Sequence, residues 1–241
     1  MNKTEHPLEA LRFFVSQPHS CSYFSNRDST SVVLDPDTPL TTALYETLIQ
    51  YGFRRSGKML YRPHCATCQD CIASRVRLAN YSPSRNQRRN IKLNKGISIR
   101  IQEPYFNDEH FALYCRYLDG QHPAGGMNNP TPESYLEFLT SNAIDTIFME
   151  GRVDNQLILV AAIDRLKHGW SAVYTFYDPQ QKQRGLGKYA ILWQLEQLQQ
   201  QQLPWLYLGY WLEDHQKMSY KNQYQPFEIY QNDQWLELNR D

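Results

Sequence analysis

The second half of the chain sets out its strands and helices in an informative order. Three strand candidates follow one another, separated by polar or glycine-bearing turns: Ile144–Glu150, Leu157–Arg165 and Trp170–Tyr177. Turns of this kind join antiparallel neighbours, so the three segments predict a meander. The other predicted elements here are helices over 107–118, 131–141 and 188–201 and a strand over 206–211.

This order of elements resembles the plan of the GNAT acyltransferases. In that plan an antiparallel meander splays away from the strand that follows it, and the wedge between them takes the acyl donor. The resemblance implies an α+β fold, with a GNAT-like transferase domain and a mostly antiparallel sheet over residues 96–241. Residues 1–95 then form a smaller N-terminal region that contains most of the cysteines and the basic segment. A likeness of fold alone does not give a function.

The first half of the chain has shorter elements. Thr38-Pro39 offers an N-cap and a proline at the first helical position, and Gly52 offers a stop, so a helix is predicted between them. Alternation over 72–78 predicts a strand, and residues 84–96 predict a basic helix ended by glycine.

The charge of the chain is zero on average but is unevenly distributed. Lys and Arg number 25, as do Asp and Glu, yet no acidic residue occurs between Cys71 and Gln102, where eight basic residues lie. A concentrated basic segment favours a polyanionic partner such as RNA. The simpler alternative is a solvated basic helix and strand. No run approaches the roughly 20 apolar residues that a membrane span needs, so no membrane association is expected.

Three of the five cysteines lie within seven positions, Cys65, Cys68 and Cys71. An odd number, clustered in this way, is not typical of a secreted disulfide framework, so a reducing cytoplasmic location is expected. Two-residue spacings allow several thiolates to converge on zinc or an iron–sulfur cluster, with Cys21 or His64 as a fourth ligand. The alternative is that these are small, partly buried residues.

A glycine-rich loop precedes the helix predicted over 188–201. Its glycines let backbone N–H groups point outward at the positive end of the helix, which suits a phosphate. Tyr189 stands where a small residue would be expected in an acetyl-CoA pyrophosphate loop, which argues against that cofactor. An ordinary strand-to-helix turn is the alternative.

The segment from Tyr207 to Lys221 alternates aromatic rings with lysines. Rings and lysines together can stack an unpaired nucleotide and neutralise its phosphates. Strand alternation places Tyr207 and Trp211 on one face and Tyr210 on the other, so at least one face is expected to be ordinary core.

Several long motifs resemble one family in the right order. YRPHCATCQDC and RVRLANYSPSRNQRR are similar to the N-terminal signature of bacterial aspartate/glutamate leucyltransferases, relatives of the eukaryotic arginyl-tRNA–protein transferases. HSCSYF, YTFYDP, RGLGKYAILWQLE and LGYWLEDHQKMSYKNQYQPFEI extend the likeness from Phe13 to Ile229. The resemblance implies transfer of leucine from leucyl-tRNA to proteins with an N-terminal Asp or Glu, which marks them for degradation.

The implied reaction is aminolysis of an ester, for which positioning and an oxyanion donor suffice, so no cofactor is required for the transfer. A carboxylate or phenol in the wedge can take the proton of the amine. The candidate catalytic residues are Tyr177, Asp178 and Tyr210. The candidate metal ligands are Cys21, Cys65, Cys68 and Cys71.

The acidic acceptor needs a cation, best an arginine fork. The candidate acceptor-binding residues are Arg85, Arg88 and Arg89. Arg88 and Arg89 point in different directions on a helix, so one can hold the acceptor while another contacts tRNA phosphate. The candidate tRNA-binding residues are Arg184, Gly185, Gly187, Lys188, Lys217 and Lys221.

Two rival functions remain open at this stage. One is an acetyl-CoA-dependent GNAT N-acetyltransferase, and the other is a non-catalytic RNA-binding module organised by a metal. The sequence selects neither the metal nor an oligomeric state, and leucine rather than arginine as the donated residue rests on the family likeness.

Overall fold

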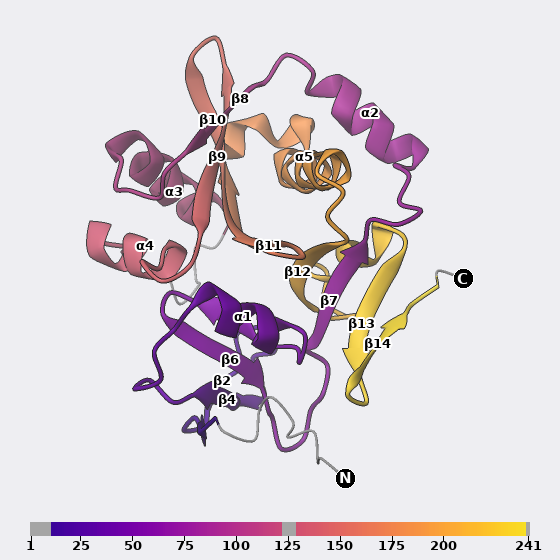
Figure 1. Cartoon of the computed structure of the whole chain (residues 1–241). Helices are drawn as coiled ribbons and strands as arrows, with labels where there is room; N and C mark the ends of the chain where they lie inside the picture. Colours follow the sequence, from indigo (N-terminus) through magenta and orange to yellow (C-terminus); the bar gives the residue numbers. More distant parts are fainter. Residues whose placement is uncertain (1–10, 122–128, 240–241) are drawn as a thin grey trace.

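The computed structural model of the chain describes residues 11–121 and 129–239. Its centre is an eight-stranded sheet in the order β14-β13-β7-β12-β11-β10-β9-β8 (Figure 1). Of its seven neighbouring strand pairings, all except that of β11 with β12 are antiparallel. The protein is therefore a mixed α/β structure built on a large, mostly antiparallel sheet.

The meander predicted from the sequence is confirmed. It consists of β9 (Thr146–Val153), β10 (Gln156–Leu166) and β11 (Gly169–Tyr177), paired antiparallel in sequence order. Nine of the eleven residues of β10 are buried, which explains its nearly continuous apolar sequence. The outermost strand on this side is β8 (Ser98–Gln102).

The sheet divides at β11 and β12 (Trp205–Trp211). These strands pair in parallel only through Gly169 with Trp205, Trp170 with Leu206 and Ser171 with Tyr207. Beyond this point β12 continues along β7 (Ile72–Arg77), after a bulge next to Gly209. Gly209 has a φ of +75°, a left-handed conformation that glycine adopts without strain. The two strands thus form a wedge that starts after Ser171.

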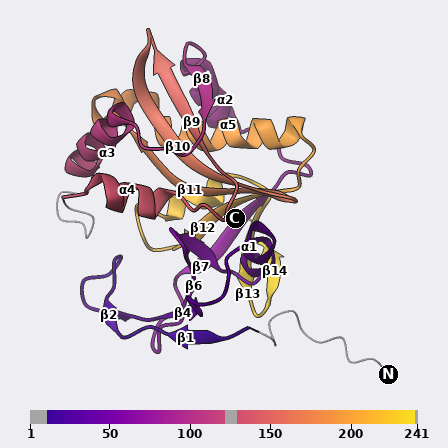
Figure 2. The same cartoon turned by 60° about the vertical axis from the view of Figure 1, so that its left-hand side comes forward.

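Helices cover both faces of the sheet. Helices α3 (Asp108–Gln121) and α4 (Pro132–Leu139) pack on one face, with Tyr114 and Tyr135 against Phe148 and Phe176. Helix α5 (Leu186–Gln200) covers the other face, and α2 (Arg85–Leu93) lies alongside it (Figures 1 and 2). Ser84 and Gln87 form a capping box that fixes the start of α2.

The N-terminal region has a second, smaller sheet in the order β1-β4-β6-β5 and the helix α1 (Thr42–Ile49). The four strands are β1 (Phe13–Val15), β4 (Ser31–Leu34), β5 (Arg54–Ser56) and β6 (Met59–Pro63). A short ribbon pairs β2 (His19–Ser20) with β3 (Asp28–Ser29). Helix α1 starts later than the sequence suggested, because Thr41 rather than Thr38 supplies the N-cap.

Two connections join the N-terminal region to the large sheet. The chain leaves the small sheet and enters the large one as β7, which lies between β12 and β13 (Phe227–Gln231). Arg55 on β5 forms a fully buried, two-pronged ion pair with Asp164 on β10, with N–O distances of 2.7 and 2.6 Å. Strand β14 (Gln234–Glu237) closes the edge beyond β13. In the part of the chain that the structure describes, no helix has the length and apolar character needed to cross a bilayer.

Candidate active site in the wedge

The wedge exposes the middle of a strand that would otherwise be buried. Residues 172–175 of β11 are all partly exposed, although β11 lies near the centre of the large sheet. They have no partner strand on the β12 side, because the parallel pairing stops at Ser171. An opening between two strands, flanked by helices, is a position at which α/β enzymes commonly place a ligand.

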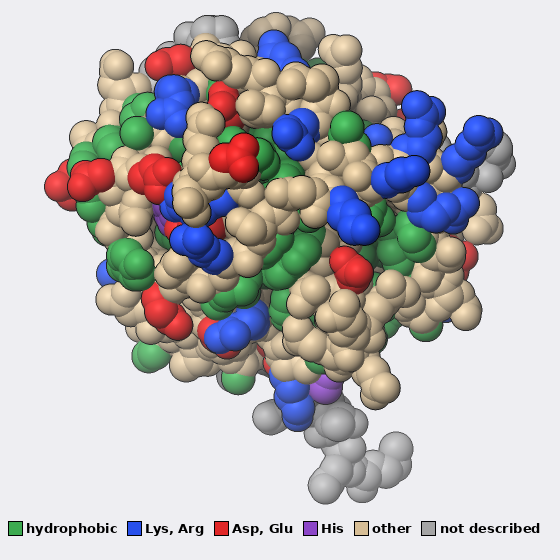
Figure 3. All heavy atoms as spheres, turned by 90° about the horizontal axis from the view of Figure 1, so that it is seen from above, with side chains coloured by type: hydrophobic (Ala, Val, Ile, Leu, Met, Phe, Trp, Pro, Cys, Tyr) green, Lys and Arg blue, Asp and Glu red, His purple; other side chains and the backbone are tan. Residues whose placement is uncertain are grey.

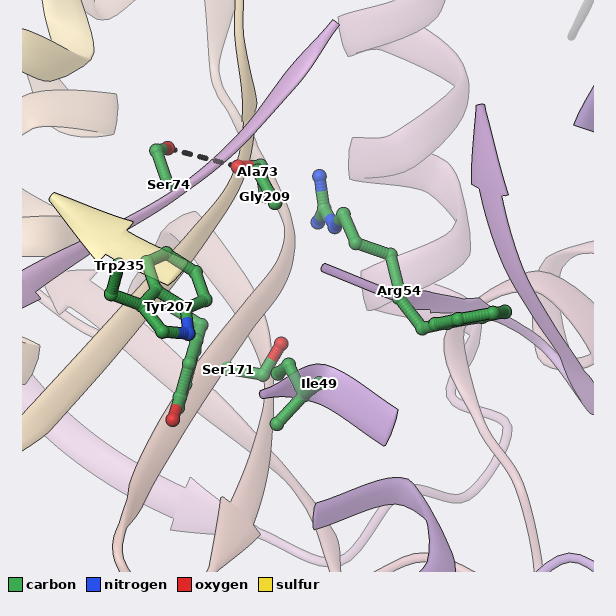
Figure 4. A pocket seen from close by; sticks show the side chains of 9 residues that line it. Ile49, Arg54, Ala73, Ser74, Ser171, Tyr207, Gly209 and Trp235 are labelled. Carbon is green, nitrogen blue, oxygen red and sulfur yellow. Dashed lines mark hydrogen bonds between the residues drawn. The ribbon is translucent and has the colours of Figure 1, made fainter. Parts of the chain in front are cut away.

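Arg54 occupies the inner end of this wedge (Figure 4). It is the first residue of β5, and its Nη2 donates to the carbonyl of Ala172 at 3.3 Å. Its guanidinium also lies 5.6 Å from the centre of the Tyr210 ring. A Cβ atom at Gly209 would lie 1.5 Å from Nη1 of Arg54, so any other residue at this position would displace the guanidinium. No sequence pattern points to Arg54, because its role depends on how β5 meets the large sheet.

Lys221 is buried inside the molecule, against the backbone of Tyr210. It belongs to the short 3-10 helix η2 (Ser219–Gln223), and its Nζ donates to the backbone carbonyl of Tyr210. Burial lowers the pKa of Lys221 well below its usual value, and the charge of Arg54 lowers it further. Lys221 was predicted to contact tRNA, but the structure places its side chain inside the protein rather than on the outer surface.

Tyr210 connects the two sheets. Its phenol Oη donates to the carbonyls of Gly52, at 3.2 Å, and Tyr61, at 3.0 Å. Burial raises the pKa of Tyr210 well above its usual value, so the phenol stays protonated. These contacts give Tyr210 a clear structural role in holding β6 against β12, and its catalytic role stays a prediction.

Tyr177 lies at the outer end of the wedge, against the start of α5. A Cβ atom at Gly187 would be 3.4 Å from the Tyr177 ring, so the glycine brings the ring and the helix together. The ring of Tyr117 on α3 is 5.0 Å away. Burial raises the pKa of Tyr177, so at neutral pH its phenol is a hydrogen-bond donor rather than a base. The structure thus brings together two predicted site residues, Tyr177 and Gly187.

Asp178 follows directly and is buried. Its carboxylate accepts a hydrogen bond of 2.9 Å from the backbone N–H of Gln180 and thereby caps the 3-10 helix η1 (Pro179–Arg184). That bond fixes the turn between β11 and α5. Asp178 stays a predicted catalytic residue, with this capping role established by the geometry.

Helix α2 holds the loop that precedes α5. Asn90 donates to the carbonyls of Arg184, at 2.9 Å, and Gly185, at 3.3 Å, and Asn94 donates to Arg184 at 2.9 Å. Gly185 adopts a left-handed φ of +59°, which turns the chain into α5. The loop was predicted from its glycines, whereas the two asparagines that position it were not among the predicted site residues.

The predicted acceptor-binding arginines lie on the solvent side of α2. Arg85, Arg88 and Arg89 are all exposed, as are Lys92 and Lys95. Seen from above the sheet, Lys and Arg side chains gather on the side of the molecule where α2 lies (Figure 3). The structure therefore joins α2 and the start of α5 into one basic surface, beside the outer end of the wedge. Lys217 lies elsewhere, with Nζ donating to the carbonyl of Gln121 at 3.1 Å.

The cysteines predicted to bind metal line a single cavity of about 390 Å³ in the N-terminal region. Tyr23, Tyr61 and Tyr210 line it as well. Burial, together with the nearby thiols of Cys21, Cys65 and Cys68, raises the pKa of Cys71 to about 12. Converging thiolates that disfavour one another's ionisation are a donor set suited to a cation. Within residues 11–121 and 129–239, however, no three His, Cys, Asp or Glu side chains are already arranged to hold an ion.

Comparisons with known proteins define the family. The model of the N-terminal part of arginine-tRNA-protein transferases matches residues 19–89, and the model of the C-terminal part matches residues 109–231. Together these define a transferase with the two parts in the expected order. The chain belongs to the arginine-tRNA-protein transferase family.

Individual relatives share one description. An aspartate/glutamate leucyltransferase of Pseudomonas aeruginosa (strain LESB58) is 44% identical over 231 residues, which cover 96% of this chain and 98% of the relative. An aspartate/glutamate leucyltransferase of Saccharophagus degradans is 45% identical over 230 residues, which cover 95% of this chain and 98% of the relative. Among solved structures, L-PGS from Bacillus licheniformis matches with a TM-score of 0.45 and 13% identity, over 70% of this chain and 49% of that one.

Proposed function

We propose that this protein transfers leucine from leucyl-tRNA to the α-amine of proteins that begin with Asp or Glu. The observation that carries the proposal is identity of 44% over nearly the full length of aspartate/glutamate leucyltransferases. The aligned residues cover 96% of this chain and 98% of that relative. The natural setting is cytoplasmic protein turnover, in which the added leucine marks a protein for degradation.

We propose a GNAT-like use of the large sheet, with the activated acyl group held in the wedge between β11 and β12. The supporting features are the meander, the limited parallel contact at Ser171 and the turn into α5 at Gly185. From Ala172 to Tyr177 the strand spans roughly 16 Å at about 3.3 Å per residue. An exposed strand edge of that length is available to the reacting groups.

The reaction itself is balanced without a cofactor. The neutral amine nitrogen of the acceptor attacks the ester carbonyl carbon, the new C–N bond forms, and the C–O bond to the ribose breaks. The proton lost by the amine ends on the ribose oxygen that leaves. Because an α-amine has a pKa near 7.7–8.0, part of it is already neutral at cellular pH, and positioning supplies much of the rate.

Tyr177 is suited to donate a hydrogen bond to an oxygen of the ester as negative charge develops there. Its raised pKa keeps the donor hydrogen in place at neutral pH, and it lies at the end of the wedge beside α5. Asp178 is the proposed proton acceptor, acting directly or through water, since it follows Tyr177 in the chain. Tyr210 is proposed to line the inner end of the same site.

The basic surface of α2 and the start of α5 is proposed to bind the acceptor end of tRNA. Exposed arginines on α2 suit the phosphate backbone, and the loop residues Arg184, Gly185, Gly187 and Lys188 lie next to them. Lys217 is proposed to contact tRNA at a point away from this basic surface. Arg85, Arg88 and Arg89 thus take one of the two roles that the sequence left open, and their exposure favours phosphate.

Cys21, Cys65, Cys68 and Cys71 are proposed to bind zinc or an iron–sulfur cluster. The donor set fits because all four line one cavity, and a metal would remove the mutual repulsion of their thiolates. A metal there would supply rigidity to the loop that leads into β7. The transfer chemistry proposed above does not depend on it.

The decisive experiment is transfer of labelled leucine from leucyl-tRNA to three peptides that differ only in their first residue, Asp, Glu or Ala. We expect label on the Asp and Glu peptides alone, with arginyl-tRNA as the control for donor choice. Transfer of acetyl from acetyl-CoA would instead support a conventional acetyltransferase. Binding of tRNA with no transfer to any peptide would support a non-catalytic RNA-binding module.

A further inference from the structure

We propose that Arg54 receives the acidic side chain of the acceptor, and that it sets the preference for Asp and Glu at the N-terminus. This inference rests on the proposed function and adds to it the group that recognises the substrate. Arg54 was not among the residues predicted from the sequence.

The first argument is charge. The buried arginines Arg55 and Arg75 each have a carboxylate partner, Asp164 at 2.6 Å and Glu228 at 2.7 Å. Arg54 and Lys221 form no ion pair within the residues that the structure describes. A partly buried guanidinium is costly to leave without a counter-charge, and an anion that joins it removes that cost. The carboxylate of the acceptor is the anion that the proposed reaction brings.

The second argument is hydrogen bonding. A guanidinium has five N–H donors, and the described residues accept a hydrogen bond from only one, the Nη2 donor to Ala172. The remaining donors are therefore available for the fork geometry that matches a carboxylate. The Tyr210 ring and the backbone at Gly209 lie against the guanidinium and limit its movement, so the fork is pre-positioned.

The third argument is position. Arg54 lies at the inner end of the wedge, whereas Tyr177 and the start of α5 lie at the outer end, beside the basic surface of α2. An acceptor side chain on Arg54 would place its α-amine farther out along β11, toward the tRNA end. A tRNA phosphate fits Arg54 less well, because the exposed arginines of α2 already provide an extended surface for the backbone.

The test compares Arg54→Met with Arg62→Met. Arg62 is a matched control: it is also partly buried, also donates to a backbone carbonyl, that of Tyr51 at 3.0 Å, and also lies over a ring, that of Phe53. Each variant is assayed with peptides that begin Asp, Asn, Glu or Gln, and its affinity for leucyl-tRNA is measured separately. Leucine transfer by the wild type to the Asp peptide is measured first. If the wild type transfers no leucine, the proposed function fails, and this result does not depend on Arg54.

For Arg54→Met we expect kcat/KM for the Asp and Glu peptides to fall about 100-fold or more, as for loss of a desolvated charged partner. The Asn and Gln peptides should change little, and the leucyl-tRNA Kd should stay within about twofold of wild type. Arg62→Met should keep the wild-type preference for Asp over Asn. Arg54→Lys retains the charge and packing but not the guanidinium fork, so its preference for Asp over Asn should be intermediate. If Arg54→Met does not fold, Arg54→Lys is the variant that tests the inference.

Two results would overturn the inference. One is an unchanged ratio of Asp to Asn transfer in Arg54→Met or, if that variant does not fold, in Arg54→Lys. The other is a loss of leucyl-tRNA affinity that parallels the loss of transfer, which would assign Arg54 to the RNA.

Discussion

At the scale of single residues, the wedge concentrates positive charge where proteins usually avoid it. Lys221 is buried and has no carboxylate partner among the described residues, and Arg54 is its charged neighbour. The folded protein therefore favours the neutral amine of Lys221, whereas the unfolded chain binds a proton with the usual pKa of a lysine. Such a difference makes stability depend on pH.

The sign of this dependence is fixed by the lowered pKa. Between the lowered folded pKa and the usual value near 10.4, the unfolded state binds more protons, so the wild type loses stability as pH falls. Lys221→Met lacks this titration. We expect the unfolding free energy of wild type relative to Lys221→Met to decrease as pH is lowered from about 10 to 7, by up to about 1.4 kcal/mol per pH unit. Urea unfolding measures it, and a difference independent of pH would contradict it.

At the scale of secondary-structure elements, the two faces of α2 have different roles. One face is exposed and basic, and the other presents Asn90 and Asn94 to the loop before α5. The loop carbonyls of Arg184 and Gly185 receive their hydrogen bonds from these amides. The position of the proposed phosphate-binding loop is thus set by a helix almost a hundred residues earlier in the chain.

Replacement of Asn90 should therefore affect the donor substrate. We expect Asn90→Ala to raise the KM for leucyl-tRNA roughly 10-fold, because about 1–3 kcal/mol of ordering of the loop is lost with its hydrogen bonds. The KM for the Asp peptide should stay nearly the same. Asn86→Ala, at an exposed position of the same helix, is the control. Steady-state kinetics with each substrate varied in turn would refute the idea if both variants behaved alike.

Patterns confined to one element were predictable from the sequence, and contacts between distant elements were not. Three apolar segments separated by polar or glycine-bearing turns were enough to predict the meander, and its three strands are confirmed. The start of α1 was wrong by several residues, because Thr38 and Thr41 are equally good caps locally and packing selects Thr41. Arg54 was missed because nothing in its neighbours indicates that β5 delivers it to Gly209, 155 residues later.

At the scale of the whole molecule, the N-terminal region and the large sheet share a strand. β7 lies between β12 and β13, and its Val76 is fully buried in the core under α5. Phe227 and Leu206 face the same core. Removal of β7 would leave two edges of the large sheet unpaired and uncover apolar side chains from both neighbours.

The fragment 96–241, which retains the whole of the predicted transferase domain, should therefore fail to fold alone. We expect it to lack a cooperative thermal transition and to be digested rapidly by protease, whereas the full chain resists. The fragment 72–241, which restores β7, should recover part of the protection. A sharp unfolding transition for the shorter fragment would contradict this expectation.

Between Ala172 and Tyr177, β11 presents backbone donors and acceptors to the wedge without a neighbouring strand of the large sheet on that side. An extended peptide can add to such an edge as one more strand. To do so, the incoming chain needs several residues free of its own structure behind the first. A protein whose N-terminus is tied into a helix or sheet would be spared, whatever its first residue, until cleavage or unfolding releases that end.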